Sequence, residues 1–451
     1  MDTQSQGMTH KIASFIVHTD KTQIPQDAYD HAKVAFMDWL AVTIGGKNDP
    51  LVKKLIAYED IMGGHSQASI LGYHMKKSVA QAALINGAAS HALDYDDTLV
   101  SFLGHPSVTI FPSILALCEW KEKNGIDLLT AYLIGLQAGG TIGACASLDH
   151  YMAGWHATST IGHLASAAAC AKLLNLNEKQ TRHALGIAGT QSSGLKRVFG
   201  SMCKPFHAGN AAQAGLMAAM LAKDDFTSAE NIIEGPQGFF DVLKGKVNED
   251  ILGLLGLGWD VVNLSQKYHA SCHATHSPLE ACLSLINEHN IAIHTIQSIK
   301  VHSSQMAIDA AGNNNPQTGM EGKFSISYCI SNAILRGTTG TIAFTDEKVN
   351  DPTIKALMKK IDVVLDSKRV ALESQVEIIT TNGDKFEAFS DILQQIPPLD
   401  IKKDRVKKKF QDLLKPTLSQ QKIEQMQECI ENLENIENIK PFIQGLNHHD
   451  E

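Results

Sequence analysis

The chain has 451 residues, a length that predicts roughly two or three domains. Apolar residues make up 44% and charged residues 19%, which is typical of a well-packed globular protein and not of a disordered one. The 39 Lys and Arg against 48 Asp and Glu give a net charge of −9, which argues against a nucleic-acid partner because such proteins need a basic surface.

The first twenty residues contain no basic segment followed by a long apolar one, so we expect no secretory signal. The most apolar candidate for a membrane span, residues 159–174, includes His163 and Lys172 and is better explained as a buried helix, so we expect no membrane partner. The eight cysteines form no CxxC pair, which favours reduced, buried thiols over disulfides or structural zinc.

The first part of the chain, residues 1–264, shows helical periodicity almost throughout. Ala, Gly and Leu occur on all sides of these segments, as in helices that are buried on more than one face. We therefore predict a large helical domain. Its clearest helices are residues 27–44, 79–91, 108–123, 128–140, 158–174, 178–189 and 208–223.

The pattern changes at about residue 265. Residues 296–301 alternate as a half-buried strand does, and Asn382-Gly383 between two further β-like runs, 376–381 and 386–388, indicates a hairpin. A short apolar run lies at 342–345. We predict a mixed α+β domain over residues 265–397, ended by two prolines, and a return to amphipathic helices over 398–451.

Four segments place polar groups in apolar, glycine-rich surroundings. The first is HALDYDDT at 91–98, followed by GHPS at 104–107. Asp94 and Thr98 would share one face if the preceding helix continued. Its clustered carboxylates need a cation or raise one another's pKa, but DxDD alone is a weak metal signal, and helix capping is the structural alternative.

The second segment is GWHAT at 154–158, where His156 precedes a predicted helix whose free N–H groups attract anions. The third is KPFH at 204–207. Lys204 precedes a proline, so we expect it in extended backbone before a helix that begins near His207. A packed histidine and a surface lysine are the alternatives.

The fourth segment is KYHASCHATH at 267–276, at the boundary between the predicted helical and α+β domains. Domain boundaries favour ligand sites, whereas HxxxHxxH is not a recognised zinc spacing. Tyr328 follows in FSISY, just inside a helical run, and could equally be a core tyrosine. The chain has no GxSxG, no GxxxxGK[ST] and no GxGxxG between a strand and a helix, which disfavours serine-hydrolase, nucleotide and flavin functions.

Taken together, these segments resemble the MmgE/PrpD family, which includes 2-methylcitrate dehydratases, cis-aconitate decarboxylases and iminodisuccinate epimerases. The motifs occur in the family's order, together with GTQSSGLKRVFGSMCKPFHAGNAAQAGL at 189–216 and GKFSISYC at 322–329, and they span nearly the whole chain. The form of the 202–216 segment and the length near 450 resemble the shorter decarboxylase and epimerase members. One departure is His269-Ala270, where the family often has an aromatic residue and a proline.

The resemblance implies a mainly α fold, with a large helical domain closed by the C-terminal helices and a smaller α+β lid domain. It also implies a cytoplasmic, metal-free homodimer that acts on a small carboxylic acid without a cofactor. The implied pocket residues are Asp94, Thr98, His105, His156, Lys204, Lys267 and Tyr328, and we add His276 as a further substrate-binding candidate.

The family's shared chemistry is proton movement at a carbon next to a carboxylate, which requires cations and hydrogen-bond donors where negative charge develops. Lys204 and Lys267 would bind substrate carboxylates, and His105 and His156 would act as the acid/base pair. Asp94 and Thr98 would orient the histidines or a substrate hydroxyl, and we expect His276 to contribute to substrate binding.

Tyr328 would donate a hydrogen bond from the lid. A decarboxylase acting on a cis-aconitate-like acid leads our interpretation. Alternatives are a 2-methylcitrate or citrate dehydratase, an iminodisuccinate epimerase, and a non-catalytic protein that binds carboxylates.

Overall fold

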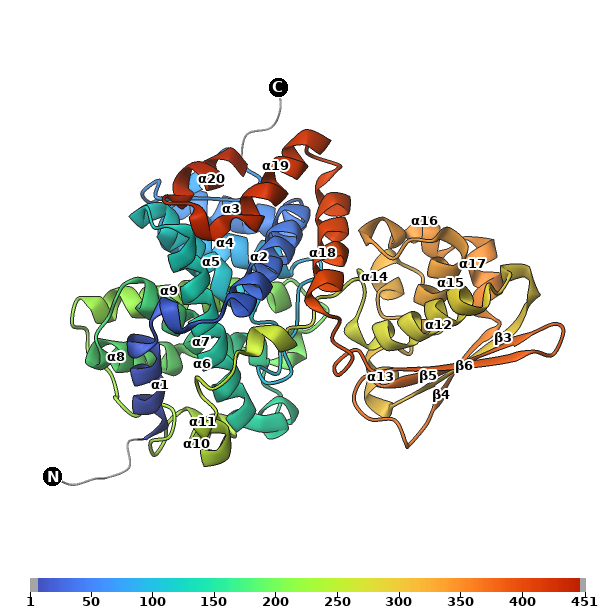
Figure 1. The fold of residues 1–451 in the computed structure, drawn as a ribbon, viewed down its shortest axis with the longest axis horizontal. Coiled ribbons are helices and arrows are strands. Elements are labelled where there is room, and N and C mark those ends of the chain that lie inside the picture. The colour runs from blue at the N-terminus through green and yellow to red at the C-terminus, as the bar shows by residue number, and fades with distance from the viewer. Residues whose placement is uncertain (1–6, 447–451) are drawn as a thin grey trace. The chain divides into compact units, whose positions relative to one another are not determined.

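The computed structural model describes residues 7–446, and its fold is mainly α-helical (Figure 1). The described chain divides into two compact units, the first from residues up to 266 together with those from 399 onward, and the second from 267 to 398. The C-terminal helices thus belong to the same unit as the N-terminal ones, so the first unit is discontinuous in sequence.

The first unit is built from helices around a core of small and aliphatic side chains. Two short strands, β1 (Ala68–Ser69) and β2 (Lys76–Lys77), form its small antiparallel sheet. Its helices are α1 (Met8–His18), α2 (Gln26–Gly46), α3 (Pro50–Met62), α4 (Val79–His91), α5 (Ser107–Lys121), α6 (Gly125–Met152), α7 (Ala157–Leu173), α8 (Glu178–Gln191), α9 (Cys203–Lys223), α10 (Phe239–Leu243), α11 (Glu249–Gly253), α18 (Leu399–Leu414), α19 (Gln420–Glu431) and α20 (Ile439–Leu446).

Local sequence explains where the central helices begin. Ser78 caps α4 by accepting a hydrogen bond from the backbone N–H of Gln81, whose side chain bonds back to the Ser78 N–H. Asn177 and Gln180 form the same capping box at α8. Helix α9 packs against both α4 and α7 through small residues, which allows close backbone approach.

Helix α6 is long and apolar enough to cross a membrane by length and composition, but 94% of its most apolar window is buried inside the protein. Its apolar character is therefore used in the core of the first unit. The backbone leaves the helical region inside α6 at Ser147, where φ is 58°.

The second unit combines a four-stranded sheet with short helices. The strand order is β4 (Ile361–Leu365), β3 (Ile296–Ser303), β5 (Ser374–Thr380), β6 (Lys385–Ser390), with β3 parallel to β4 and the other pairs antiparallel. Helices α12 (His276–His289) and α15 (Ile326–Arg336) pack on this sheet (Figure 1). The remaining helices are α13 (Gln305–Ala311), α14 (Gly319–Gly322), α16 (Asp346–Val349) and α17 (Pro352–Met358).

The predicted hairpin is present between β5 and β6. Gly383 has φ of 88°, a left-handed conformation that favours glycine, and the turn closes through the backbone N–H of Thr380 to the carbonyl of Asp384. The 342–345 run forms no strand, because Thr341–Ala343 is a 3₁₀ turn. The sequence also gave no sign of β4, a five-residue edge strand that is only half buried.

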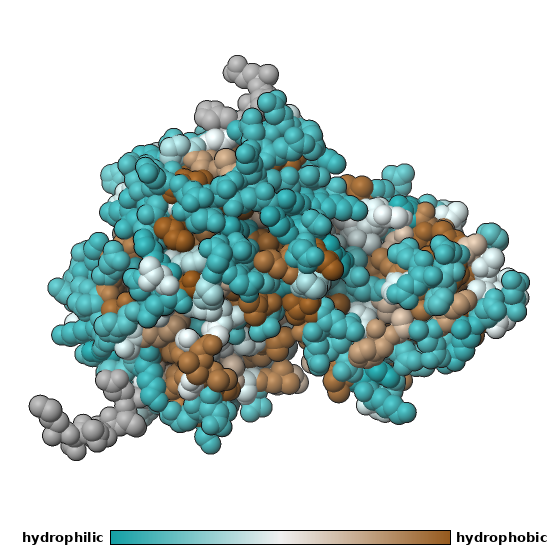
Figure 2. All heavy atoms as spheres, in the orientation of Figure 1, coloured by the Kyte–Doolittle hydropathy of each residue, from teal (hydrophilic) through white to brown (hydrophobic). Residues whose placement is uncertain are grey.

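The surface face shown in Figure 2 is mostly hydrophilic, and apolar residues reach it only in separate areas. All eight cysteines lie in the described residues and are free, in line with the absence of CxxC pairs.

Candidate active site

The loop after α4 carries the first group of site residues. Helix α4 ends at His91, and Asp94 has φ of 52°, in the left-handed region. The helix ends at His91, as its periodicity predicted, so the condition under which Asp94 and Thr98 would share a helix face is not met. Because the chain turns at Asp94, the carboxylates of Asp94 and Asp96 meet different partners.

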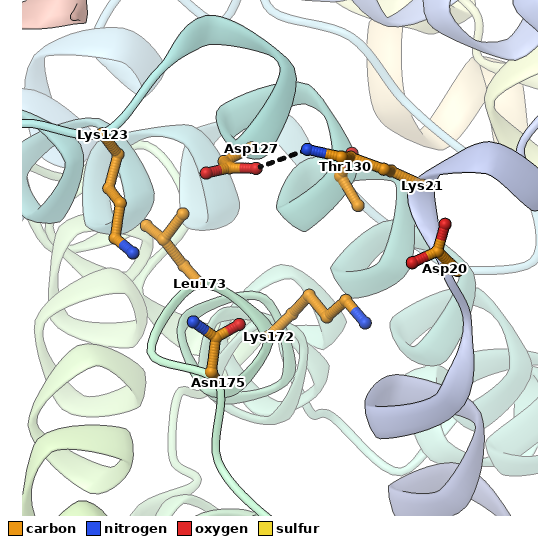
Figure 3. Close-up of a pocket in the computed structure, with 8 residues that line it drawn as sticks. All are labelled: Asp20, Lys21, Lys123, Asp127, Thr130, Lys172, Leu173 and Asn175. Atoms are coloured by element: carbon orange, nitrogen blue, oxygen red, sulfur yellow. Dashed lines mark ion pairs between the residues drawn. The ribbon is translucent and has the colours of Figure 1, made fainter.

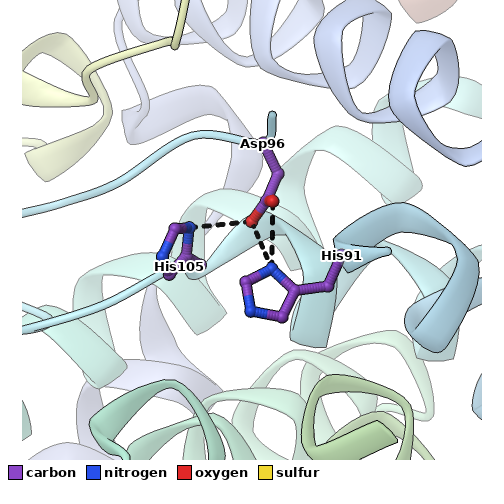
Figure 4. Close-up of side chains that lie close together, drawn as sticks. All are labelled: His91, Asp96 and His105. Carbon is purple, nitrogen blue, oxygen red and sulfur yellow. Dashed lines mark hydrogen bonds and ion pairs between the residues drawn. The ribbon is translucent and has the colours of Figure 1, made fainter. Parts of the chain in front are cut away.

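Asp96 lies between two imidazoles, as Figure 4 shows. Its Oδ2 is 2.9 Å from Nδ1 of His91 and 2.8 Å from Nδ1 of His105. The Asp96 side chain is 1% exposed and that of His105 is 13% exposed. Burial alone would raise the pKa of Asp96, but the two imidazoles beside it hold that pKa well below its ordinary value, so the carboxyl group is ionised.

A further site residue, Lys204, comes from the start of α9. Nζ of Lys204 lies 2.7 Å from Oδ1 of Asp94, and both side chains are about one-fifth exposed. Lys204 is inside α9, which begins at Cys203, so the expected extended backbone at this lysine is wrong. The following proline is tolerated because the first turn of a helix needs no N–H donor.

His156 directly precedes α7 and is buried. Its Nδ1 is 3.0 Å from Nδ1 of His207, so one of these nitrogens donates a hydrogen bond to the other. Burial, followed by the positive potential of His91 and Lys204, lowers the pKa of His156 well below its ordinary value. His156 is therefore a neutral imidazole at neutral pH.

Glycines let these segments approach each other. A Cβ on Gly104 would lie 2.6 Å from Oγ1 of Thr158 in α7, which itself accepts a hydrogen bond from the backbone N–H of His105. A Cβ on Gly87 of α4 would lie 2.7 Å from the Cα of Gly209 in α9. Close packing without side chains thus brings the ends of α4, α7 and α9 together at the imidazoles.

Buried charged side chains also hold the loop of residues 94–98 in place. Lys409 of α18 forms an ion pair with Asp38 of α2, at 2.6 Å, and donates a hydrogen bond to the backbone carbonyl of Tyr95. Burial raises the pKa of Asp97 well above its ordinary value, and Asp97 accepts a hydrogen bond from the hydroxyl of Ser107. These contacts fix the 94–98 loop from several helices.

Thr98 lies in this loop and is half-buried. Its backbone pairs with Ser265 through two hydrogen bonds of 2.9 Å. The next residue, Leu99, donates its N–H to the carbonyl of Gly104, which closes the loop that carries His105.

The other three predicted residues belong to the second unit. Lys267 and His276 are buried, and Nε2 of His276 lies 3.3 Å from the carbonyl oxygen of Ser271. Burial, with His269 and His273 nearby, lowers the pKa of His276 well below its ordinary value. Tyr328 is fully buried in α15, and its hydroxyl donates a hydrogen bond to the carbonyl of Ala343.

In the first unit the structure thus brings together Asp94, His105, His156 and Lys204. It adds three residues that sequence reasoning missed, His91, Asp96 and His207. Their signal was present, because His91 and Asp96 stand in the HALDYDDT motif and His207 stands in KPFH.

Among the described residues, ligand atoms of His91, Asp96 and His105 lie within 4.8 Å of one another, close enough to hold a metal ion. The nitrogen–oxygen distances of 2.8–2.9 Å are also those of ordinary charge-assisted hydrogen bonds. The hydrogen-bonded interpretation satisfies the carboxylate without an added ion, and chelation tests it below.

A separate cavity of about 200 Å³ is lined by lysines and aspartates, as Figure 3 shows. Two of its three lysines have partners within the protein: Lys172 donates to the carbonyls of Val17 and Thr19, and Lys21 lies 3.8 Å from Asp127. We therefore place the candidate site at the imidazoles and not at this cavity.

Comparison with known sequences identifies the class of protein. The MmgE/PrpD N-terminal domain matches residues 10–251, and the MmgE/PrpD C-terminal domain matches residues 269–435. The chain belongs to the MmgE/PrpD family. The C-terminal match extends into α18 and α19, which the structure assigns to the first unit.

Named relatives share this similarity over nearly their whole length. A cis-aconitate decarboxylase of Aspergillus terreus is 24% identical, covering 98% of this chain and 96% of the relative. The cis-aconitate decarboxylase-like protein oryM of Aspergillus oryzae is 23% identical, covering 95% of both chains. The human cis-aconitate decarboxylase is 22% identical, covering 94% of this chain and 92% of the relative.

Proposed function

We propose that this protein is a lyase that removes CO2 from cis-aconitate or a closely similar tricarboxylic acid. The observation that carries the proposal is the cluster of Asp96, His105, His156 and Lys204, in which a half-buried imidazole paired with a buried carboxylate lies near a neutral imidazole. The names of the relatives support the choice of decarboxylation within the family.

The reaction breaks one carbon–carbon bond to a carboxylate. The carboxylate leaves as CO2, and its bonding electron pair stays on carbon, where conjugation with the neighbouring alkene and carboxylate spreads the charge. One proton is then added to carbon, so each turnover consumes one proton. The protein must therefore bind carboxylates, stabilise the carbanion and supply that proton.

In this mechanism Lys204 binds a substrate carboxylate beside Asp94. His105 supplies the proton as an imidazolium stabilised by the Asp96 carboxylate. His156, held neutral by burial and neighbouring cations, orients the substrate or an intermediate through a hydrogen bond. Lys267, Tyr328 and His276, and the side chain of Thr98, remain predictions from the family resemblance.

A substrate panel tests this proposal. The purified protein is incubated with cis-aconitate, 2-methylcitrate and iminodisuccinate, and CO2, alkene absorbance and optical rotation are followed. CO2 release from cis-aconitate supports the proposal. Turnover only of 2-methylcitrate or of iminodisuccinate would replace it with the dehydratase or the epimerase, and binding without turnover would favour the non-catalytic alternative.

The metal-free, homodimeric and cytoplasmic character implied by the resemblance remains part of the proposal. Activity after EDTA treatment should equal that of untreated protein. Loss on chelation with recovery on adding a divalent ion would instead assign a metal to His91, Asp96 and His105. Light scattering after size exclusion tests the dimer.

A further inference from the structure

The arrangement around Asp96 contains more than a single histidine–carboxylate pair. The Asp96 carboxylate contacts two imidazoles, those of His105 and His91. The side chain of His91 is completely buried at the C-terminal end of α4. Nδ1 of His91 lies 2.9 Å from both carboxylate oxygens, and its ring centroid lies 4.6 Å from that of His105. Nothing in the proposed reaction requires His91 to touch the substrate.

The Asp96 carboxylate determines which ring nitrogens of His91 and His105 carry hydrogen. An ionised carboxylate only accepts hydrogen bonds, so Nδ1 of each imidazole must carry a hydrogen. In a neutral imidazole the other nitrogen, Nε2, then carries no hydrogen and is the nitrogen that can take up a proton. His105 is the more exposed of the two, so its Nε2 is the nitrogen that can exchange a proton with a substrate.

We propose that Asp96 and His91 form a positioning pair for His105: His91 fixes the Asp96 carboxylate from the buried side, and Asp96 fixes the ring orientation and tautomer of His105. This rests on the proposed function in that it assigns His105 the proton-transferring role. Asp96 also stabilises the imidazolium of His105 when Nε2 holds a proton.

The titratable and charged groups around these imidazoles come from several helices. Asp94 and Asp96 belong to the loop after α4, His156 precedes α7, and Lys204 and His207 belong to α9. Asp38 and Lys409 form a further buried pair whose charges act on Asp96. Asp96 is the carboxylate that contacts both His91 and His105.

The first test is Asp96→Asn. We expect kcat to fall about 100-fold or more with KM changed less than about threefold, because the substrate carboxylates meet Lys204 and not Asp96. The alkaline limb of the kcat profile should move to lower pH by about one unit or more, since an imidazolium loses its carboxylate partner. An unchanged pH profile would overturn the proposal.

The second test separates hydrogen bonding from packing at His91. In His91→Asn the side-chain amide can donate to Asp96 as Nδ1–H does, whereas His91→Leu fills similar space without a donor. We expect His91→Asn to keep kcat within about threefold of wild type and His91→Leu to lose about tenfold. Equal activity of the two variants would show that His91 serves packing only.

A measurement without substrate keeps this proposal separate from the proposed function. ¹⁵N NMR of histidine-labelled protein reports which ring nitrogen carries hydrogen. We expect the Nδ1–H form for His91 and His105 in the wild type and a changed signal for His105 in Asp96→Asn. The Nε2–H form of His105 in the wild type would overturn the positioning role, whether or not cis-aconitate is turned over.

Discussion

Each unit of the chain holds a cluster of histidines, and the two clusters differ in their partners. In the first unit, Asp96 is shared by His91 and His105, and Lys204 and Asp94 add opposite charges nearby. In the second unit, His269 is held by Glu280 and by the hydroxyl of Thr339. The ring centroid of His276 lies 4.8 Å from that of His269 and 4.9 Å from that of His273.

This difference shows that a histidine count alone does not locate chemistry. Burial keeps His276 neutral, and its Nε2 lies within hydrogen-bond distance of the backbone carbonyl of Ser271. His105 instead combines partial exposure with a fully buried carboxylate, which is the arrangement that favours a proton-carrying imidazole. The predictions below test the contrast, starting with the largest effect.

The largest effect is expected at His156. His156→Gln should lower kcat by about 1,000-fold, because its neutral ring lies among the groups proposed to act on the substrate. The matched control is His163→Gln, at a buried histidine of α7, the helix that follows His156, whose Nδ1 donates to the carbonyl of Ser159. Steady-state kinetics should show the control within about threefold of wild type. Equal losses in the two variants would contradict the assignment.

The next largest effect is expected at the buried ion pair between Lys409 and Asp38, which supports the loop of residues 94–98. Lys409→Met leaves Asp38 buried without its cation, and we expect it to lower the free energy of unfolding by about 3–5 kcal/mol. Adding Asp38→Asn to this variant should recover much of that loss. Urea unfolding of the three variants measures this, and an additive double variant would mean that the two side chains do not interact energetically.

A third prediction uses pH. Burial lowers the pKa of His163 to about 4, whereas an unfolded histidine takes up a proton near pH 6.5. Between these values the unfolded state binds the extra proton, so His163 makes folding less favourable as pH falls. Relative to wild type, His163→Gln should gain about 3 kcal/mol between pH 6.5 and pH 4, measured by urea unfolding at both values. A pH-independent difference would be inconsistent with a neutral His163.

The smallest effect is expected in the second unit. Glu280 is about one-third exposed, and in Glu280→Gln the amide oxygen can still accept from Nε2 of His269. We expect less than about 1 kcal/mol of lost stability and kcat within about twofold of wild type. A loss as large as that of Asp96→Asn would remove the distinction between the clusters.

Parts of the fold followed from local sequence alone. Periodicity predicted 79–91 as a helix, and the structure has α4 at the same bounds. The Asn382-Gly383 turn predicted its hairpin. The weakly patterned edge strand β4 was missed, since half-buried edge residues carry little alternation. The 342–345 run was misleading, since apolar character alone does not distinguish a strand from a turn packed on a core.

Parts of the candidate site required spatial information. The motifs named Asp94, His105, His156 and Lys204 one by one, but their order along the chain does not show which carboxylate meets which cation. The left-handed backbone at Asp94 separates its carboxylate from that of Asp96, and periodicity, which ended the helix at His91, does not show where the following side chains point.

The helical character of the first unit and the family can be read from the sequence, because both depend on local periodicity and on motifs. The folded structure is needed to show that Asp96 contacts two histidines, that Lys204 pairs with Asp94, and that α18 supports the site loop through Lys409. These contacts join residues that are far apart in the sequence, such as Lys409 and Tyr95, which are separated by 314 positions. Local sequence patterns do not record such contacts.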